Sequence, residues 1–85
     1  MNSTQANRRL GEALRRRRRS LALSQLQLCD LAGVGPAFLY DLEKGKPTVR
    51  LDKLLAVLEV LGLGLELVER GDVLGVASNL GEGRK

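Results

Sequence analysis

The chain is organised around residues 23–46, LSQLQLCDLAGVGPAFLYDLEKGK, a pattern that predicts two short helices joined by a tight turn. Ser24 has the short hydroxyl side chain that caps a helix N-terminus, and it precedes apolar residues at helical spacing. Gly33 ends the first helix, because glycine adopts a positive φ at no steric cost. Pro36 begins the second helix, since proline there removes only an N–H that would lack a partner, and Gly45 ends it.

The spacing of apolar residues predicts which faces of these two helices are buried. Leu39 and Leu42 are expected to face the core. The apolar residues assigned to the first helix are Leu28, Cys29, Ala32 and Val34. The predicted outward face of the second helix consists of Ala37, Phe38, Tyr40 and Asp41. Two helices and a glycine turn of these lengths are the signature of a helix-turn-helix, whose second helix can read the major groove of DNA.

Residues 23–46 resemble the helix-turn-helix of the lambda-repressor/Cro-type (Xre-like) family, in their SQ start, GVG turn and EKG ending. The continuation KPTVRLDKLLAVLEVLGLGLEL, residues 46–67, is similar to a narrower group, the HipB-like antitoxin regulators. Together these resemblances cover about residues 10–70. They imply an all-α, lambda-repressor-like bundle of four to five short helices, with a C-terminal β-strand that pairs across a dimer.

The composition limits the chain to one small domain of 85 residues with a net charge of +4, which favours an anionic partner. One cysteine and no histidine leave no intrachain disulfide, no cysteine-based metal cluster and no imidazole base. We therefore expect no cofactor. No apolar run approaches the roughly 20 residues that span a bilayer, and no signal peptide is recognisable. These features favour a cytoplasmic, nucleoid-associated protein without a membrane partner.

The order of the elements predicts four segments along the chain. Residues 1–7 are polar and are expected to be flexible. Residues 8–62 form the helix-turn-helix domain, residues 63–70 a dimerisation strand, and residues 71–85 a flexible, glycine-rich tail.

Two further helices are predicted on either side of residues 23–46. The first runs from about Gln5 or Asn7 to Leu21, and the last from about Leu51 to Leu61. The core stripe of the first helix is Leu10, Ala13, Leu14 and Leu21. That of the last is Leu51, Leu54, Leu55, Leu58 and Leu61, with Val57 beside it. Because this stripe is wider than a small bundle needs, we expect part of it to pack across a dimer.

Residues 15–19 are five consecutive arginines. Guanidinium groups bridge phosphate oxygens well, so this run can contact DNA; the alternative is a solvated helix face. Consecutive residues on a helix point in all directions, so the five cannot share one role. The resemblance implies that Arg18 forms a salt bridge with Glu43, which would tie the first helix to the recognition helix.

The resemblance also implies which residues contact DNA. Gln25 matches a glutamine that contacts the phosphate backbone in relatives; the alternative is a plain polar residue in the first turn. Lys44, Lys46 and Arg50 match a phosphate-binding loop. The positions near base edges are Pro36, Ala37, Phe38, Tyr40 and Asp41, and Gly35 before them is also assigned to DNA binding.

The predicted reading face has unusual chemistry for this family, whose members often present glutamine, serine or arginine there. Ala37 and Phe38 can pack on thymine methyls, Tyr40 can donate a hydrogen bond, and Asp41 can accept one from cytosine N4. None of them is a bidentate donor to guanine or adenine, so specificity is expected to depend on DNA shape. Alternatively, Phe38 packs inward or serves a protein contact.

Cys29 occupies a position where relatives usually have alanine, which predicts a small apolar core residue. A redox role would require a lowered thiol pKa, for which the neighbouring sequence provides no cause.

Residues 65–69 alternate in polarity, which predicts a strand. A lone strand leaves its backbone groups unpaired, and the HipB-like resemblance implies pairing with the same strand of a second subunit. The predicted dimerisation residues are Leu65, Glu66, Leu67, Val68 and Glu69. A loosely packed tail is the alternative.

The leading functional hypothesis is a sequence-specific DNA-binding repressor, a homodimer with recognition helices about 34 Å apart on a palindromic operator. The HipB-like resemblance implies the antitoxin of a type II toxin–antitoxin system, which silences its own operon and binds a HipA-like serine/threonine kinase toxin, in part through residues 71–85. The alternatives are a stand-alone Xre-type regulator and a protein-interaction module that does not bind DNA. An enzyme is the least favoured class, because the sequence lacks a nucleophile–base pair and a metal-ligand cluster.

Overall fold

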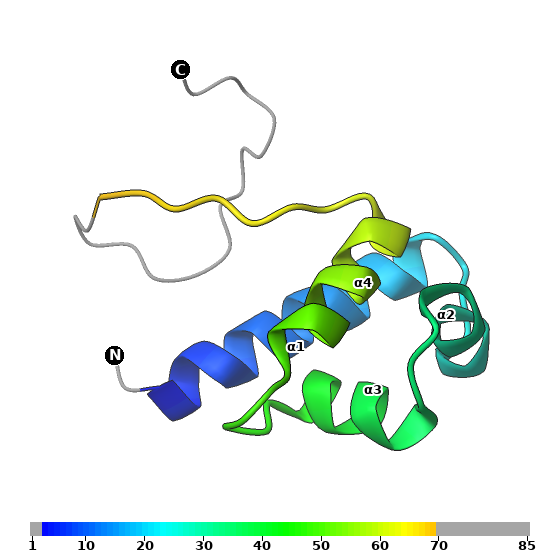
Figure 1. Ribbon diagram of the computed structural model, residues 1–85, viewed down its shortest axis with the longest axis horizontal. Helices are drawn as coiled ribbons and strands as arrows, with labels where there is room; N and C mark the ends of the chain where they lie inside the picture. The colour runs from blue at the N-terminus through cyan, green and yellow to red at the C-terminus, as the bar shows by residue number, and fades with distance from the viewer. Residues whose placement is uncertain (1–2, 70–85) are drawn as a thin grey trace.

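The computed structural model describes residues 3–69, which contain four helices (Figure 1). They are α1 (Ser3–Ser20), α2 (Gln25–Ala32), α3 (Pro36–Lys44) and α4 (Leu51–Leu61). Helix α3 packs against α1 and α2, and α4 packs against the same two helices from the other side of the core. The helix-turn-helix pair α2–α3 is therefore held by α1, which packs mainly on α3, and by α4, which packs mainly on α2.

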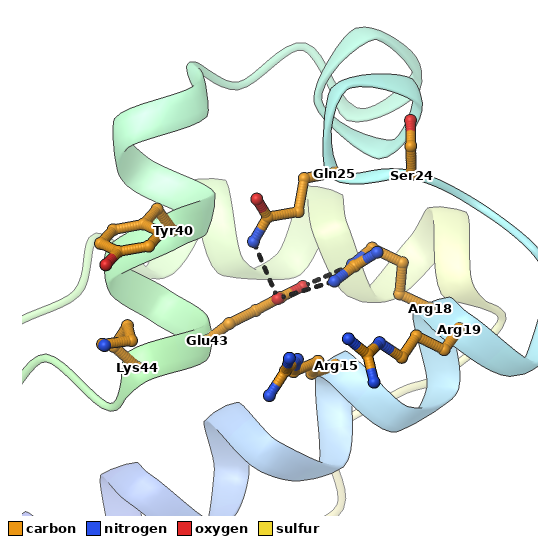
Figure 2. Close-up of a pocket in the computed structure, with 8 residues that line it drawn as sticks. All are labelled: Arg15, Arg18, Arg19, Ser24, Gln25, Tyr40, Glu43 and Lys44. Carbon is orange, nitrogen blue, oxygen red and sulfur yellow. Dashed lines mark hydrogen bonds and ion pairs between the residues drawn. The ribbon is translucent and has the colours of Figure 1, made fainter.

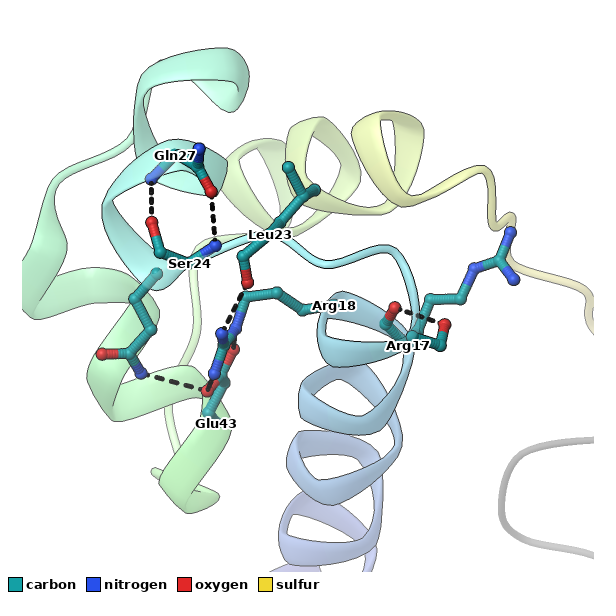
Figure 3. Close-up of polar contacts among 8 residues, drawn as sticks. Arg17, Arg18, Leu23, Ser24, Gln27 and Glu43 are labelled. Atoms are coloured by element: carbon teal, nitrogen blue, oxygen red, sulfur yellow. Dashed lines mark hydrogen bonds and ion pairs between the residues drawn. The ribbon is translucent and has the colours of Figure 1, made fainter.

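Local sequence signals set the ends of the two central helices, as predicted. The Ser24 hydroxyl accepts a hydrogen bond from the Gln27 N–H at 3.0 Å, and the Gln27 side chain accepts one from the Ser24 N–H at 2.7 Å (Figure 3). This reciprocal capping box satisfies two N–H groups that would otherwise lack partners. Gly33 and Gly45 end α2 and α3 with φ of 73° and 88°, in the left-handed region that favours glycine.

The core lies where the four helices meet, and each helix contributes a leucine to its centre. These leucines are Leu14, Leu28, Leu39 and Leu61, each at most 2% exposed. Cys29 is buried among them, which confirms its prediction as a small core residue. Burial raises the pKa of the Cys29 thiol, so the reactive thiolate is disfavoured.

Several predicted boundaries and faces were wrong. Helix α1 begins at Ser3, before its predicted start at about Gln5 or Asn7, so residues 3–7 are helical and do not form the predicted flexible start. Leu21 lies beyond the end of α1 and is exposed, because the chain turns there and the next residue, Ala22, has a φ of 59°. Val34 is buried but belongs to the turn after α2 rather than to the helix.

The apolar stripe of α4 is only partly buried. Leu54, Val57, Leu58 and Leu61 are buried, whereas Leu51 and Leu55 are exposed. Two residues one turn apart share a side of a helix, and this side faces away from α1 and α2. The stripe is therefore wider than the contact surface within one chain.

Residues 63–69 leave the end of α4 as an extended segment with exposed side chains, apart from half-buried Leu63 (Figure 1). The described residues contain no β-strand, so the predicted strand does not form within this single chain. Residues 1–2 and 70–85, which include the rest of that strand and the predicted flexible tail 71–85, lie outside the described residues. None of the helices of residues 3–69 is both long enough and apolar enough to cross a bilayer.

Candidate nucleic-acid interface

Helix α3 presents an exposed face to solvent. Pro36 and Ala37 in its first turn are exposed, as is Tyr40, at 53%, one turn further on. Asp41 is half-buried at the edge of this face. The outward prediction for Phe38 was wrong in part: its ring is half-buried against the core and lies 5.7 Å from Lys53 Nζ. The alternative that Phe38 packs inward therefore describes it better.

A buried ion pair fixes the position of α3 on α1. Arg18 Nε donates to Glu43 Oε2 at 2.7 Å and Arg18 Nη2 donates to Glu43 Oε1 at 3.1 Å, a bidentate contact (Figure 2). Arg18 Nη1 donates to the Leu23 carbonyl at 2.9 Å, and Gln25 Nε2 donates to Glu43 Oε1 at 3.0 Å. The hydrogen bond to Glu43 raises the pKa of Arg18. The structure thus brings together the two residues that the family resemblance pairs, and it adds Gln25.

The burial of this pair determines how much the loss of one partner would destabilise the fold. The side chains of Arg18 and Glu43 are 8% and 4% exposed, and every buried side-chain N or O atom in residues 3–69 has a hydrogen-bond partner. Burying two charges is costly, and a buried charge that loses its partner is strongly destabilising. The pair therefore joins α1 to α3, and Gln25 of α2 binds the same carboxylate, so three helices meet at Glu43.

A basic concave surface lies on the loop side of α3, and we call it the loop-side surface. It is lined by Ala37, Phe38, Asp41, Lys46, Thr48, Val49 and Arg50. Lys46 Nζ lies 3.5 Å from Asp41 Oδ2, and Arg50 Nη2 lies 2.6 Å from Asp52 Oδ2. Both ion pairs are exposed, and such pairs contribute little to stability, so both cations can exchange to another anion.

The loop that carries these cations is tied to α1. Asn7 Nδ2 donates to the Pro47 carbonyl at 3.1 Å. A Cβ built on Gly11 would lie 2.5 Å from the Leu42 carbonyl oxygen, so α1 passes directly against the backbone at the end of α3. Side chains at position 11 would separate the two helices, and glycine permits their close approach.

A second basic concave surface lies between α1 and α3, and we call it the α1-side surface. It is lined by Arg15, Arg18, Arg19, Ser24, Gln25, Tyr40, Glu43 and Lys44 (Figure 2). Lys44 Nζ lies 5.4 Å from the centroid of the Tyr40 ring, a favourable cation–π geometry. Arg15 and Arg19 were not predicted individually as site residues within the run of five arginines. Their spacing from Arg18 could have identified them, because a buried Arg18 that contacts Glu43 places Arg15 and Arg19 beside α3 as well.

The match to known proteins fits this architecture. Residues 9–71 match the model of the helix-turn-helix domain family. The chain belongs to this family. It is 40% identical, over 63 residues, to an uncharacterized helix-turn-helix-type transcriptional regulator, y4mF, of Sinorhizobium fredii. That alignment covers 74% of this chain and 83% of the relative.

In this helix-turn-helix protein, α2 supports α3 through the hydrogen bond from Gln25 to Glu43, and both helices have exposed residues. Within residues 3–69, no group of three or more His, Cys, Asp or Glu side chains is arranged to hold a metal ion. The exposed part of α3 and its two basic flanks instead form a surface suited to a polyanion. The predicted dimerisation residues lie apart from this surface, in the extended segment after α4, where Leu67 is 97% exposed.

Proposed function

We propose that this protein is a sequence-specific DNA-binding transcriptional repressor, with α3 as its recognition helix. The observation that carries the proposal is the placement of basic side chains on both sides of an exposed α3. A helix that enters the major groove lies between two phosphate backbones, so it requires cations on both flanks. The relative y4mF, named as a transcriptional regulator, supports the same role.

The proposed base contacts come from Pro36, Ala37 and Tyr40, which are exposed, and from Asp41 at the edge of the face. Gly35 is exposed at the N-terminus of α3, where backbone N–H groups can meet a phosphate. Because Phe38 is half-buried, we assign it to positioning α3 rather than to reading bases. Few hydrogen-bonding groups remain on the face, so sequence preference depends in large part on DNA shape.

A direct test is binding to a labelled duplex from the region upstream of the protein's own gene. We expect wild-type protein to bind, and the double variant Lys46→Glu/Arg50→Glu to lose most of its affinity because both cations lie on the loop-side surface. Arg9→Glu/Arg16→Glu is the matched control, since both arginines are exposed and lie on the side of α1 opposite Arg18. Equal losses in the two double variants would contradict a specific role for the loop-side surface.

The proposed repressor is a homodimer in which residues 63–70 pair as strands across a twofold axis. The exposed apolar side chains of Leu65, Leu67 and Val68 support this assignment, as do exposed Leu51 and Leu55 on α4. Leu67→Pro removes a backbone donor from the strand and is expected to give monomers in light scattering, whereas Leu67→Val keeps the dimer. A monomeric wild type would contradict the dimer.

The finer proposal is an antitoxin that silences its own operon and neutralises a HipA-like serine/threonine kinase. It rests on the resemblance of residues 46–67 to HipB-like regulators. Co-expression with a kinase encoded by a neighbouring gene should give a stable complex and relieve growth arrest. The absence of such a gene, or of the complex, would leave a stand-alone regulator, the role that the name of y4mF describes for that relative.

A further inference from the structure

The structure divides the five arginines of residues 15–19 into separate roles. Arg18 is buried against Glu43. Arg17 Nε donates to the Leu61 carbonyl at 2.9 Å, at the C-terminal end of α4. Figure 3 shows these two side chains leaving α1 in opposite directions. Arg15, Arg16 and Arg19 are exposed, and none of them has a hydrogen-bond or ion-pair partner among residues 3–69.

Helical geometry separates these three remaining arginines. Arg15 and Arg19 are four residues apart, so they lie one above the other on one side of α1. Both line the α1-side surface next to α3 (Figure 2). Arg16 does not line it, because helical spacing places it about 80° further around α1 from the middle of this pair. Arg15 and Arg19 therefore differ from Arg16 in position but not in charge.

The α1-side surface has an excess of positive charge. Across from Arg15 and Arg19 lie Lys44 and the Tyr40 ring, on α3 (Figure 2). The carboxylate among its lining residues belongs to Glu43, and it already accepts hydrogen bonds from Arg18 and Gln25. Like charges one turn apart on a helix repel each other. An anion between α1 and α3 would remove this repulsion.

We propose that Arg15 and Arg19 clamp a DNA phosphate on the α1 side of the recognition helix, together with Lys44 and the Tyr40 hydroxyl. Guanidinium groups bind phosphate through two parallel N–H donors, which a lysine cannot reproduce. This inference rests on the proposed function, since the same α3 must lie in the groove. In this arrangement each of the two basic surfaces contacts the phosphate backbone of one DNA strand. Arg16 and Arg17 make no DNA contact.

The experiment compares Arg15→Gln, Arg19→Gln and the control Arg16→Gln, which all remove one charge from one helix. Binding is measured by fluorescence anisotropy with the labelled upstream duplex and with a mixed-sequence duplex of equal length. Arg15→Gln and Arg19→Gln should each weaken binding about tenfold on both duplexes, because a phosphate contact carries no sequence information. Arg16→Gln should change affinity by about twofold or less, since Arg16 does not line the α1-side surface and an exposed charge without a phosphate contact is screened by salt.

Salt dependence provides a second readout that a structural effect would not change. Removal of one phosphate contact should lower the slope of log affinity against log salt by about 0.9 per bound chain, for Arg15→Gln and Arg19→Gln alone. Arg19 lies in the last turn of α1, where it also interacts favourably with the helix dipole, so thermal unfolding is measured in parallel. Arg15 lies outside that turn, so it tests the clamp even if Arg19→Gln destabilises the fold.

The outcomes separate this inference from the proposed function. If wild-type protein binds but all three variants match it, or match one another, the clamp is wrong and the DNA-binding function stands. A loss limited to the upstream duplex, with an unchanged salt slope, would indicate a base contact and would also overturn the clamp. If wild-type protein binds neither duplex, the proposed function fails.

Discussion

Two arginine–carboxylate pairs in this protein have nearly the same geometry and very different surroundings. Arg18 and Glu43 make contacts of 2.7 and 3.1 Å, and Arg50 and Asp52 make contacts of 2.6 and 3.1 Å. The side chains of the first pair are 8% and 4% exposed, whereas those of the second are 67% and 64% exposed. Hydrogen-bond length alone therefore does not distinguish a fixed structural pair from an exchangeable one; burial does.

The two pairs therefore have different roles around α3. On the α1 side, burial fixes Glu43 against Arg18, so α3 has one position. On the loop side, water competes for both partners of the exposed pair, so Arg50 can release Asp52 and contact a phosphate. A DNA-binding surface requires both features: a rigid helix and cations that are free to exchange.

The largest expected change in stability comes from removing one partner of the buried Arg18–Glu43 pair. Glu43→Gln should lower the free energy of unfolding by about 3–5 kcal/mol, because it leaves the Arg18 charge buried without its partner. The measurement is urea denaturation followed by circular dichroism. Asp52→Asn is the matched change in the exposed pair and should shift the midpoint only slightly. If the two variants behaved alike, burial would not be what separates the pairs.

A second variant keeps this prediction testable if Glu43→Gln does not fold. Replacing both partners, as Arg18→Met/Glu43→Leu, removes both buried charges and should recover much of the lost stability. A double variant no more stable than Glu43→Gln would contradict the account of the buried charge.

The close approach of α1 to α3 can be tested at Gly11. A Cβ there would lie 2.5 Å from the Leu42 carbonyl and 2.6 Å from the Glu43 carbonyl, so Gly11→Ala should destabilise the fold by about 1–3 kcal/mol. This is opposite in sign to helix propensity, which favours alanine by about 1 kcal/mol. The control is Gly64→Ala, since a Cβ at Gly64 has no neighbour within 4 Å. A stabilising Gly11→Ala would show that the helices are not in close contact.

The contribution of the α2 capping box to stability can be tested at Ser24. Ser24→Ala removes the hydroxyl that accepts from the Gln27 N–H, and it should cost about 1 kcal/mol of unfolding free energy. Ser24→Asp keeps an acceptor and is expected to retain wild-type stability. An unchanged melting temperature in Ser24→Ala would mean that this cap does not contribute.

The smallest expected effect is a pH dependence of the exposed pair. The hydrogen bond from Arg50 lowers the pKa of the Asp52 carboxyl from its ordinary 3.8. The ionised form is therefore favoured in the folded state, so its contribution is present above about pH 4 and is lost as the pH falls through the lowered pKa. Acid titration of stability should show a slightly smaller loss in Asp52→Asn than in wild type. An identical acid profile would mean that the pair has no net effect.

The fold was predictable where the signal is local. The Ser24 cap, the Pro36 start and the glycine ends depend on the backbone chemistry of single residues, and all three lie where the sequence placed them. The family resemblance also identified the Arg18–Glu43 pair, which spacing within one helix does not reveal.

The remaining features depend on packing between distant segments. Whether Phe38 points outward, or Leu51 and Leu55 are buried, depends on which side of each helix faces a neighbour, and a single periodic pattern does not decide this. The roles of Arg15, Arg16 and Arg19 follow from the position of α3 beside α1. The predicted strand depends on pairing between separate chains, and residues 63–69 form no strand within one chain.

The central claim is that DNA binds across α3 and its two basic flanks, and an NMR titration with the upstream duplex tests it most directly. Backbone amide shifts should concentrate in residues 35–50 and around Arg15 and Arg19, with little change at Leu51 and Leu55. Shifts on the outer side of α4 instead, or none at saturating duplex, would contradict it.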